Sequence, residues 1–327
     1  MIEPRTEALN LIGGEWVTAS SGETLAVENP ASPEETLGTA PSSGEEDVRR
    51  AVAAASESLA GWRRALPAER GKILVRAADL IEERAGELAH LMALEVGKPM
   101  KESRPEVARA AGILRYYGSE GWRLWGAEVP STRPGVSLSA VREPLGVVAL
   151  ITPWNFPLAI PAWKLAPALV CGNTVVLKPA EQSPLLAAEL AQILQEAGLP
   201  AGVLNLVSGY GESVGEALVT DARVSGVSFT GSSEVGLAVQ QRAVGKRVQL
   251  EMGGKNPYVV MEDADIRDAA SKVAYSAFGY AGQKCTATSR AIVVEEVYEP
   301  FLRELVSAAE ALRVGTRWRR TPTWGRW

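Results

Sequence analysis

The segment that decides the fold is LGVVALITPWNFPLAIPAWKLAPALVCGNTVVLKPA, residues 145–180. It holds two short apolar runs, 145–151 and 174–178, on either side of a helix expected across residues 162–170. Unbroken runs of Val, Ile and Leu between helices are typical of parallel strands covered on both faces. The segment therefore predicts one repeat of a doubly wound, parallel α/β sheet, an architecture that commonly binds nucleotides.

The same alternation continues on the C-terminal side of this segment. Apolar runs at 203–207, 224–229 and 247–251 alternate with helices expected at 183–197, 212–218 and 234–243. A second set begins after Gly254, with runs at 257–261 and 291–295 and helices expected at 265–280 and 300–312. We therefore place a domain boundary near Gly253, which divides the chain into a unit at 1–253 and a second α/β unit at 254–315.

The residues before 145 are expected to form strands and helices that precede the parallel sheet. Short strands are expected around a Gly-Gly turn in residues 11–29, and a capping box formed by Ser43 and Glu46 predicts the start of an amphipathic helix. Pro67 is expected to open a longer helix that stops at Gly97. Polar alternation between prolines predicts an exposed β-ribbon at 129–143, whose unpaired edges favour self-association.

Composition narrows the class of protein. The 327 residues suffice for two domains, and a net charge of -5 gives no sign of nucleic-acid binding. The sequence shows neither a signal peptide nor an apolar run of about 18 residues, so we expect a cytoplasmic protein without membrane contact. Two cysteines and one histidine, His90, are too few for a disulfide framework or a zinc site, and His90 is interpreted as a solvated or salt-bridged residue.

The candidate chemistry lies between residues 248 and 290. Cys285 sits in a Gly-Gln-Lys-Cys turn, and Glu251 ends an apolar run before a Gly-Gly pair. Since the chain has a single histidine, a cysteine nucleophile would need a carboxylate as its base, and Glu251 is the candidate. A free thiol has a pKa of about 8.5, so Cys285 would need a positive local field. An inert buried cysteine is the alternative, and Cys171 receives that interpretation.

Other motifs follow predicted strands. In TPWNFP, Trp154 would form an apolar wall and the amide of Asn155 could stabilise an oxyanion, although a simple turn also explains the motif. Turn glycines such as Gly211 and Gly231 precede helices, and Ser232 offers a helix N-terminus that favours phosphate; plain turns and an N-cap are the alternatives. The remaining pair, Lys178 and Glu181, would grip a ribose or be surface charges.

Together these motifs closely resemble the aldehyde dehydrogenase superfamily. TPWNFP, LKPAEQSP, FTGSSEVG, LEMGGKNP and GQKCTATSR occur in its order and spacing, and LIGGEWV, ENPAS and LEVGKPMKES extend the resemblance over nearly the whole chain, to about Gly315. The resemblance implies a catalytic set of Cys285 as nucleophile, Glu251 as general base and Asn155 in the oxyanion hole. It also implies residues around NAD or NADP, namely Trp154, Lys178, Glu181, Gly211, Gly231 and Ser232. With the resemblance, 1–253 is expected to be the NAD(P)-binding domain and 254–315 an incomplete α/β catalytic domain.

The implied reaction is the oxidation of an aldehyde to a carboxylic acid through a cysteine thiohemiacetal and a thioester. Glu181 would repel a 2′-phosphate, which favours NAD. The presence of Glu251 favours water over coenzyme A as acceptor of the acyl group. Residues 131–164 and 278–290 look most like the branch acting on 2-oxoglutarate semialdehyde (2,5-dioxopentanoate), with pyrroline-5-carboxylate and succinate semialdehyde branches left open. Such substrates carry a carboxylate, so a cationic anchor is expected, and the sequence does not identify it.

The resemblance stops after ALRVG, at residue 315. Residues 316–327 are rich in Arg and Trp and lack acidic residues, which is compatible with a tail that binds a membrane or nucleic acid. Suitable codons for this tail, read in a shifted frame, encode Pro-Leu-Glu-Glu-Asp-Thr-Asp-Val-Gly-Pro-Val, the continuation typical of the family. We therefore interpret the tail as a frameshift product and expect weak turnover, poor solubility and an impaired homo-oligomer. The alternative function is a catalytically silent nucleotide-binding or interaction protein with a basic tail.

Overall fold

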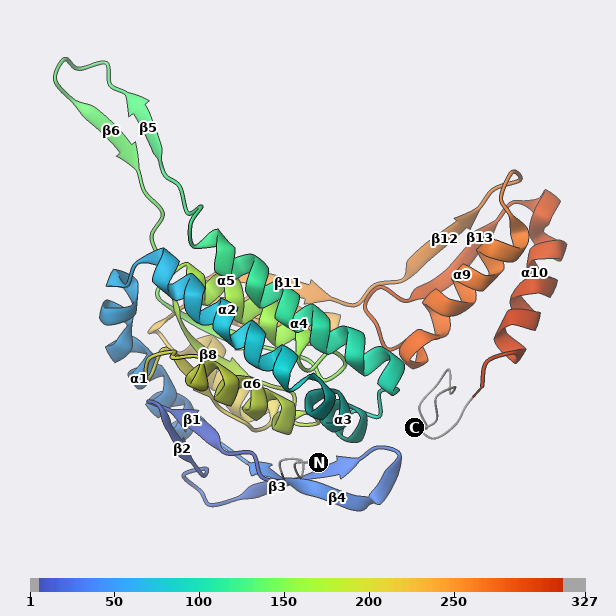
Figure 1. Cartoon of the computed structure of the whole chain (residues 1–327), viewed down its shortest axis with the longest axis horizontal. Helices are drawn as coiled ribbons and strands as arrows, with labels where there is room; N and C mark the ends of the chain where they lie inside the picture. The colour runs from blue at the N-terminus through green and yellow to red at the C-terminus, as the bar shows by residue number, and fades with distance from the viewer. Residues whose placement is uncertain (1–5, 314–327) are drawn as a thin grey trace.

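The computed structural model describes residues 6–313 and is built around one seven-stranded sheet (Figure 1). Its order is β11-β10-β7-β8-β9-β1-β2, with β11 to β9 mutually parallel and β1 and β2 antiparallel at one edge. The α/β class with a parallel-sheet core is thus confirmed. The strands are β1 (Asn10–Ile12), β2 (Glu15–Val17), β7 (Val147–Ile151), β8 (Thr174–Lys178), β9 (Leu204–Leu206), β10 (Val224–Gly231) and β11 (Arg247–Met252).

Helices cover both faces of this sheet, and each face has its own apolar core. In β7, Val148 and Leu150 point into the core beneath α2 to α6, while Val147 and Ala149 point into the core shared with α1, α7 and α8. This explains why β7 and β8 are apolar at nearly every position. The helices are α1 (Glu45–Arg64), α2 (Pro67–Glu83), α3 (Ala85–Glu95), α4 (Met100–Glu120), α5 (Ala159–Val170), α6 (Pro184–Glu196), η1 (Gly211–Gly215), α7 (Glu216–Thr220) and α8 (Ser233–Arg242).

The strand order creates a topological switch point. From β7 the chain moves outward through β8 and β9, and then returns to the other side of β7 to form β10 and β11. The loops that leave the carboxyl ends of β7 and β10 therefore diverge. In open parallel sheets a ligand crevice lies at this position.

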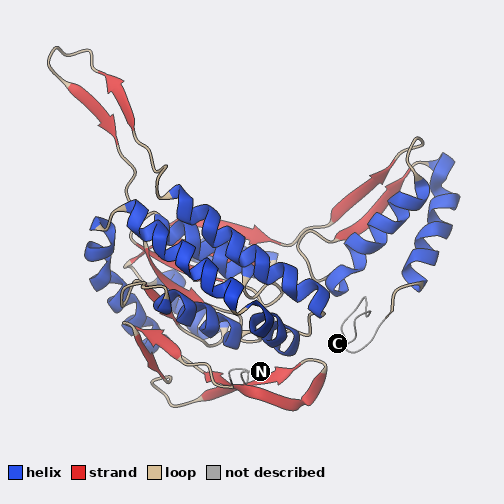
Figure 2. Ribbon diagram, in the orientation of Figure 1, coloured by secondary structure: helices blue, strands red, loops and turns tan. Residues whose placement is uncertain are grey.

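A second, smaller unit follows β11 and forms a separate arm in Figure 2. Its two parallel strands pack on two helices through a small core that includes Val260, Val273 and Phe301. The elements are β12 (Asn256–Val260), α9 (Ile266–Phe278), η2 (Gly279–Gly282), β13 (Thr288–Val293) and α10 (Glu295–Glu310). Gly253 lies between β11 and β12, which belong to different sheets, and a domain boundary there stays our prediction.

Two antiparallel ribbons flank the main sheet. The ribbon β5 (Ala127–Pro130) and β6 (Ser137–Ala140) is exposed at every residue and projects away from the body (Figure 1). It begins and ends a few residues earlier than the predicted 129–143. The second ribbon pairs β3 (Thr24–Asn29) with β4 (Ser32–Pro41).

Some local predictions were wrong. Ser43 does not cap α1, because its hydroxyl accepts a hydrogen bond from Asn10 Nδ2; Gly44 is the N-cap, and its N–H is bound by Asp47. The helix expected from Pro67 is interrupted at Arg84, whose guanidinium pairs with Glu196 at the end of α6. The last helix, α10, begins at residue 295 rather than 300.

Two further predictions concern the termini and membranes. The Arg- and Trp-rich tail at 316–327 lies outside the described residues. The frameshift hypothesis concerns this tail and therefore stays a prediction. Within residues 6–313, no helix is both long and apolar enough to span a bilayer.

Candidate active site

Cys285 is exposed on a turn of unusual backbone geometry. Just before it, Tyr280 and Ala281 adopt left-handed conformations with φ of 51° and 52°. Residues other than glycine are strained in this left-handed conformation, so the surrounding structure must hold the turn in place. One such contact is the bond from the N–H of Tyr280 to Glu102 Oε1 on α4, at 3.2 Å.

Two asparagines bind the carbonyls of the same turn. Asn256, at the start of β12, donates to Cys285 O at 2.7 Å and to Ala287 O at 3.1 Å. Asn155, in the loop after β7, donates from Nδ2 to Gln283 O at 2.7 Å. The structure therefore brings the predicted oxyanion residue to the turn that carries the predicted nucleophile, although the two lie 130 positions apart in the chain.

The loop of Asn155 is fixed in turn by a buried ion pair. Lys98, whose side chain is 1% exposed, pairs with Glu106 and donates to Asn155 O at 2.9 Å. Its Nζ also lies 4.1 Å from the ring centroids of both Phe156 and Tyr280. Desolvation lowers the pKa of Lys98, and the charge of Glu106 opposes that shift. Lys98 and Glu106 were missed in the sequence.

Glu251, the predicted base, stands near the end of the edge strand β11 and is exposed. Its Oε1 accepts a hydrogen bond from Gln249 Nε2 at 2.9 Å, and Ser228 Oγ donates to Gln249 Oε1. Lys164 Nζ on α5 donates to Ser228 Oγ at 2.7 Å. A chain of polar side chains thus runs from Lys164 to Glu251.

Lys164 is another functional candidate that sequence reasoning missed. Burial lowers its pKa to about 8, against the attraction of the Glu251 carboxylate. Within the described residues, Glu251 and Cys285 make no hydrogen bond to each other. Asn256, five residues after Glu251, is the link between the two segments.

The predicted cofactor residues lie at or beyond the carboxyl ends of four parallel strands of the sheet. Trp154 follows β7, Lys178 and Glu181 lie at the end of β8, Gly211 follows β9, and Gly231 and Ser232 lie at the end of β10. Lys178 is 3% exposed, with Nζ 2.7 Å from Pro179 O and 3.5 Å from Glu181 Oε2, and desolvation lowers its pKa. A Cβ built on Gly215 would lie 3.9 Å from Lys178 Cδ, so this lysine borders η1. At the end of β10, Ser232 caps α8 by accepting the N–H of Val235 at 3.2 Å.

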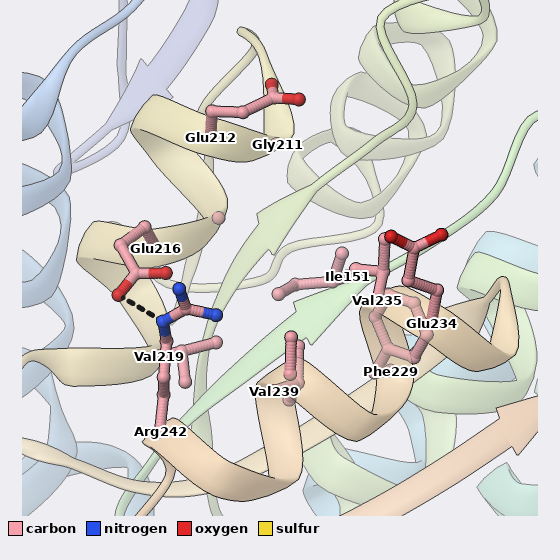
Figure 3. A pocket seen from close by; sticks show the side chains of 12 residues that line it. Ile151, Gly211, Glu212, Glu216, Val219, Phe229, Glu234, Val235, Val239 and Arg242 are labelled. Carbon is pink, nitrogen blue, oxygen red and sulfur yellow. Dashed lines mark ion pairs between the residues drawn. The ribbon is translucent and has the colours of Figure 1, made fainter.

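A cavity of about 420 Å³ separates η1 and α7 from α8 (Figure 3). Its walls are mostly apolar, and an ion pair of 2.9 Å between Glu216 and Arg242 stands at its edge. Gly211 lines the cavity, while Gly231 joins β10 to α8; a Cβ on Gly231 would come within 2.4 Å of the Phe229 ring. The apolar lining residues include Ile151, Val219, Phe229, Val235 and Val239.

This fold and this arrangement of residues place the protein in a known class: the chain belongs to the aldehyde dehydrogenase family, whose model matches residues 16–326. It is 47% identical over 317 residues to alpha-ketoglutaric semialdehyde dehydrogenase of Bacillus subtilis, covering 96% of this chain and 65% of that protein. It is 49% identical over 308 residues to alpha-ketoglutarate semialdehyde dehydrogenase of Haloferax volcanii, covering 94% and 64%.

A solved structure shares the fold. Betaine aldehyde dehydrogenase from Staphylococcus aureus, in complex with NAD+, superposes with a TM-score of 0.95 at 32% identity, covering 97% of this chain and 64% of that one. The family resemblance seen in the sequence is thus confirmed. The chain spans just under two thirds of the length of these curated relatives.

Proposed function

We propose that this chain carries the cofactor-binding and catalytic residues of an NAD(P)-dependent aldehyde dehydrogenase, which oxidises a carboxylate-bearing semialdehyde to the acid. One observation carries the proposal: side chains from three distant segments, Glu102, Asn155 and Asn256, converge on the strained turn that presents Cys285. Asn155 belongs to the loop that leaves β7 at the topological switch point of the sheet. The names of the two semialdehyde dehydrogenases similar to this chain support the substrate class.

The first chemical step is an attack on the aldehyde by the Cys285 thiolate. The sulfur forms a bond to the carbonyl carbon, and the carbonyl oxygen takes the electron pair as an alkoxide. Asn155 Nδ2 and the backbone N–H of Cys285 would donate to this oxygen. Removing one such donor costs about 3 to 4 kcal/mol of transition-state stabilisation in other enzymes. The nicotinamide cofactor, when bound, accepts the hydride that leaves this carbon.

The second step is hydrolysis of the resulting Cys285 thioester. Glu251 would remove a proton from water as the water attacks the acyl carbon, and the thiolate of Cys285 leaves. The polar chain through Gln249 and Ser228 fixes the orientation of the Glu251 carboxylate.

The residues present fit a dinucleotide. The apolar cavity between α7 and α8 suits an adenine ring, and the pair of Lys178 and Glu181 suits ribose hydroxyls. Glu212, which lines the cavity and acts electrostatically on Lys178 as Glu181 does, adds a second negative charge there. These carboxylates disfavour a 2′-phosphate, so NAD or NADP is proposed with NAD favoured.

Two further proposals concern the cellular compartment and the oligomeric state. A reactive, exposed thiol at Cys285 requires a reducing compartment, which favours the cytoplasm. The fully exposed ribbon of β5 and β6 favours pairing with another copy of the chain.

The test is the reduction of NAD+ by purified protein with 2-oxoglutarate semialdehyde, followed by absorbance. We expect an aldehyde-dependent signal that is lost in Cys285→Ser. In Glu251→Gln we expect one equivalent of reduced cofactor per chain and then little turnover, because acylation precedes the step that needs the base. Calorimetric titration with NAD+ measures binding separately. Reduction that persists in Cys285→Ser would disprove the mechanism.

A further inference from the structure

Lys98 lies where two loops meet that are far apart in the sequence. Its Nζ is 4.1 Å from the ring centroid of Phe156, in the loop after β7, and 4.1 Å from that of Tyr280, in the turn before Cys285. Nζ also donates to Asn155 O at 2.9 Å. A cation within about 6 Å of a ring face is attracted to it, most strongly where water is excluded. One buried ammonium therefore contacts both the loop of the predicted oxyanion donor and the turn of the predicted nucleophile.

The position of this ammonium is itself fixed by helices. Glu106 binds it through Oε2 and accepts the first N–H groups of α5 through Oε1. The backbone carbonyl of Lys98 accepts the hydroxyl of Ser103 at 3.2 Å, near the start of α4. Both Ser103 and Glu106 are buried on α4. The ammonium is therefore anchored in the helical layer rather than in either of the loops that it contacts.

Stability alone does not account for a buried ion pair at this place. Taking two charges out of water is costly, and apolar residues of similar volume often stabilise a fold equally well or better. An apolar side chain could not, however, bind a carboxylate, a carbonyl oxygen and two ring faces from a single atom. Lys98 does so, and one of the two rings belongs to Tyr280, whose backbone is held in a left-handed conformation. The charge thus acts where two segments have to be placed relative to each other.

We infer that Lys98 is a positioning residue, which holds the loop of Asn155 and the turn of Cys285 in the relative placement that oxyanion stabilisation requires. The inference deepens the proposed function and rests on it. Asn155 would donate to the oxygen that becomes negative as Cys285 attacks the aldehyde, so the placement matters most in the first chemical step. Loss of the ammonium should slow that step and leave cofactor binding between α7 and α8 unchanged.

The first test needs no substrate. Hydrogen–deuterium exchange followed by mass spectrometry reports local opening of the backbone. The full chain is compared with the double variant Lys98→Met with Glu106→Gln, which leaves no unpaired charge in the core. We expect exchange to accelerate several-fold in two peptides at once, one covering 152–158 and the other 279–287. Acceleration in only one of them, or in neither, would show that Lys98 does not join the two loops.

The second test measures the first turnover of NAD+ reduction with 2-oxoglutarate semialdehyde. We expect the double variant to be slower on the order of 100-fold, because misplacement by about 1 Å can cost that much. Its affinity for NAD+, measured by calorimetry, should not change. In an Asn155→Ala background the same double substitution should cost only a few-fold, since the donor that Lys98 positions is already missing. Equal losses in the two backgrounds would show that Lys98 does not act through Asn155.

Arg70→Met is the matched control, because Arg70 is another buried cation that joins two segments beside an aromatic ring. Its Nε donates to Val170 O at 2.8 Å, at the C-terminal end of α5, and its guanidinium carbon lies 5.9 Å from the Trp62 ring centroid. It should change neither the exchange of 279–287 nor the first-turnover rate per NAD+ site. If it slows the first turnover as much as the double variant does, Lys98 contributes general stability alone.

The two tests also separate the inference from the proposed function on which it rests. If the unsubstituted chain shows no aldehyde-dependent reduction, the proposed function fails, and a catalytic role for Lys98 fails with it. The exchange measurement does not depend on turnover and still decides whether Lys98 joins the two loops. If reduction occurs and the double variant acylates at the unsubstituted rate, the inference is wrong while the proposed function stands.

Discussion

Two helices that cover the sheet begin in the same way, each with a buried glutamate from another segment at its N-terminus. Glu106 accepts the N–H groups of Leu158 and Ala159 at the start of α5, both at 3.1 Å. Glu95 accepts those of Leu185 and Leu186 at the start of α6, at 2.6 Å and 3.1 Å. A carboxylate there satisfies two free donors and lies at the positive end of the helix dipole.

The two sites differ in whether the buried glutamate has a cation as its partner. Glu106 pairs with Lys98, which extends the contact to Asn155 O and to the rings of Phe156 and Tyr280. Glu95 has no cation partner among the described residues, and burial raises its pKa to about 8. One cap therefore keeps an ion pair that reaches the catalytic loop, while the other has no cation partner among the described residues and binds only the start of α6.

The largest expected effect comes from Lys98→Met, which breaks the pair on the catalytic side. It leaves Glu106 buried without a cation, and loss of one partner of a buried pair costs about 3 to 5 kcal/mol. Urea unfolding followed by circular dichroism measures the loss. The double variant Lys98→Met with Glu106→Gln should recover part of it, because no unpaired charge remains. A double variant as unstable as the sum of its two single variants would contradict this account.

The pH dependence of stability should separate the two caps. The folded pKa of Glu95, about 8, lies above its unfolded value near 4.5, so the fold favours the protonated acid. Its stabilising contribution is complete below pH 4.5 and is lost as pH rises through 8, at a slope of up to about 1.4 kcal/mol per pH unit.

Glu95→Gln mimics the protonated acid and should therefore flatten this slope between pH 6 and 8, by about 2 kcal/mol in total. The measurement is a series of urea midpoints across that range. Glu106→Gln is the matched control, since it removes a buried carboxylate at the start of α5 but should not flatten the slope. An unchanged slope in Glu95→Gln would show that the acid is ionised in the fold.

The two caps also illustrate how much of the fold and of the site the sequence could predict. The strands at 147–151 and 174–178 were predicted because burial on both faces leaves an apolar run. Asn155 was chosen from a motif, and the structure brings it to the turn of Cys285. Glu106 was missed, although it shares the buried face of α4 with Val107 and Ala110, a signal that it must have a partner.

Other contacts could not be predicted from any pattern in the sequence. Lys98 follows the glycine that ends α3, and only tertiary folding brings it against Asn155, 57 positions away. Lys164 and Ser228 come from a helix and a strand, so their bond depends on how α5 packs on β10. Periodicity predicts which face of a helix or strand is buried. It does not predict which polar group of another segment lies against that face.

The smallest expected effect concerns Asn256, which joins the start of β12 to the catalytic turn. Asn256→Ala removes two hydrogen bonds, to Cys285 O and Ala287 O, at a cost to stability of about 1 to 2 kcal/mol. The strained backbone at Tyr280 and Ala281 is then free to relax, so Cys285 should react with iodoacetamide a few-fold faster. Aldehyde-dependent cofactor reduction should fall instead, since misplacement by about 1 Å can cost 100-fold in rate.

Opposite signs in the two assays distinguish positioning from simple unfolding. Asn173→Ala is the control, because Asn173 also joins two segments, accepting the N–H of Gly146 at 3.2 Å and donating to Ala168 O at 3.0 Å, away from the turn. It should lower stability by a similar amount and leave the alkylation rate of Cys285 unchanged. If Asn256→Ala and Asn173→Ala behave alike in both assays, Asn256 contributes stability alone, and the geometry of the turn is set by Asn155 and Glu102.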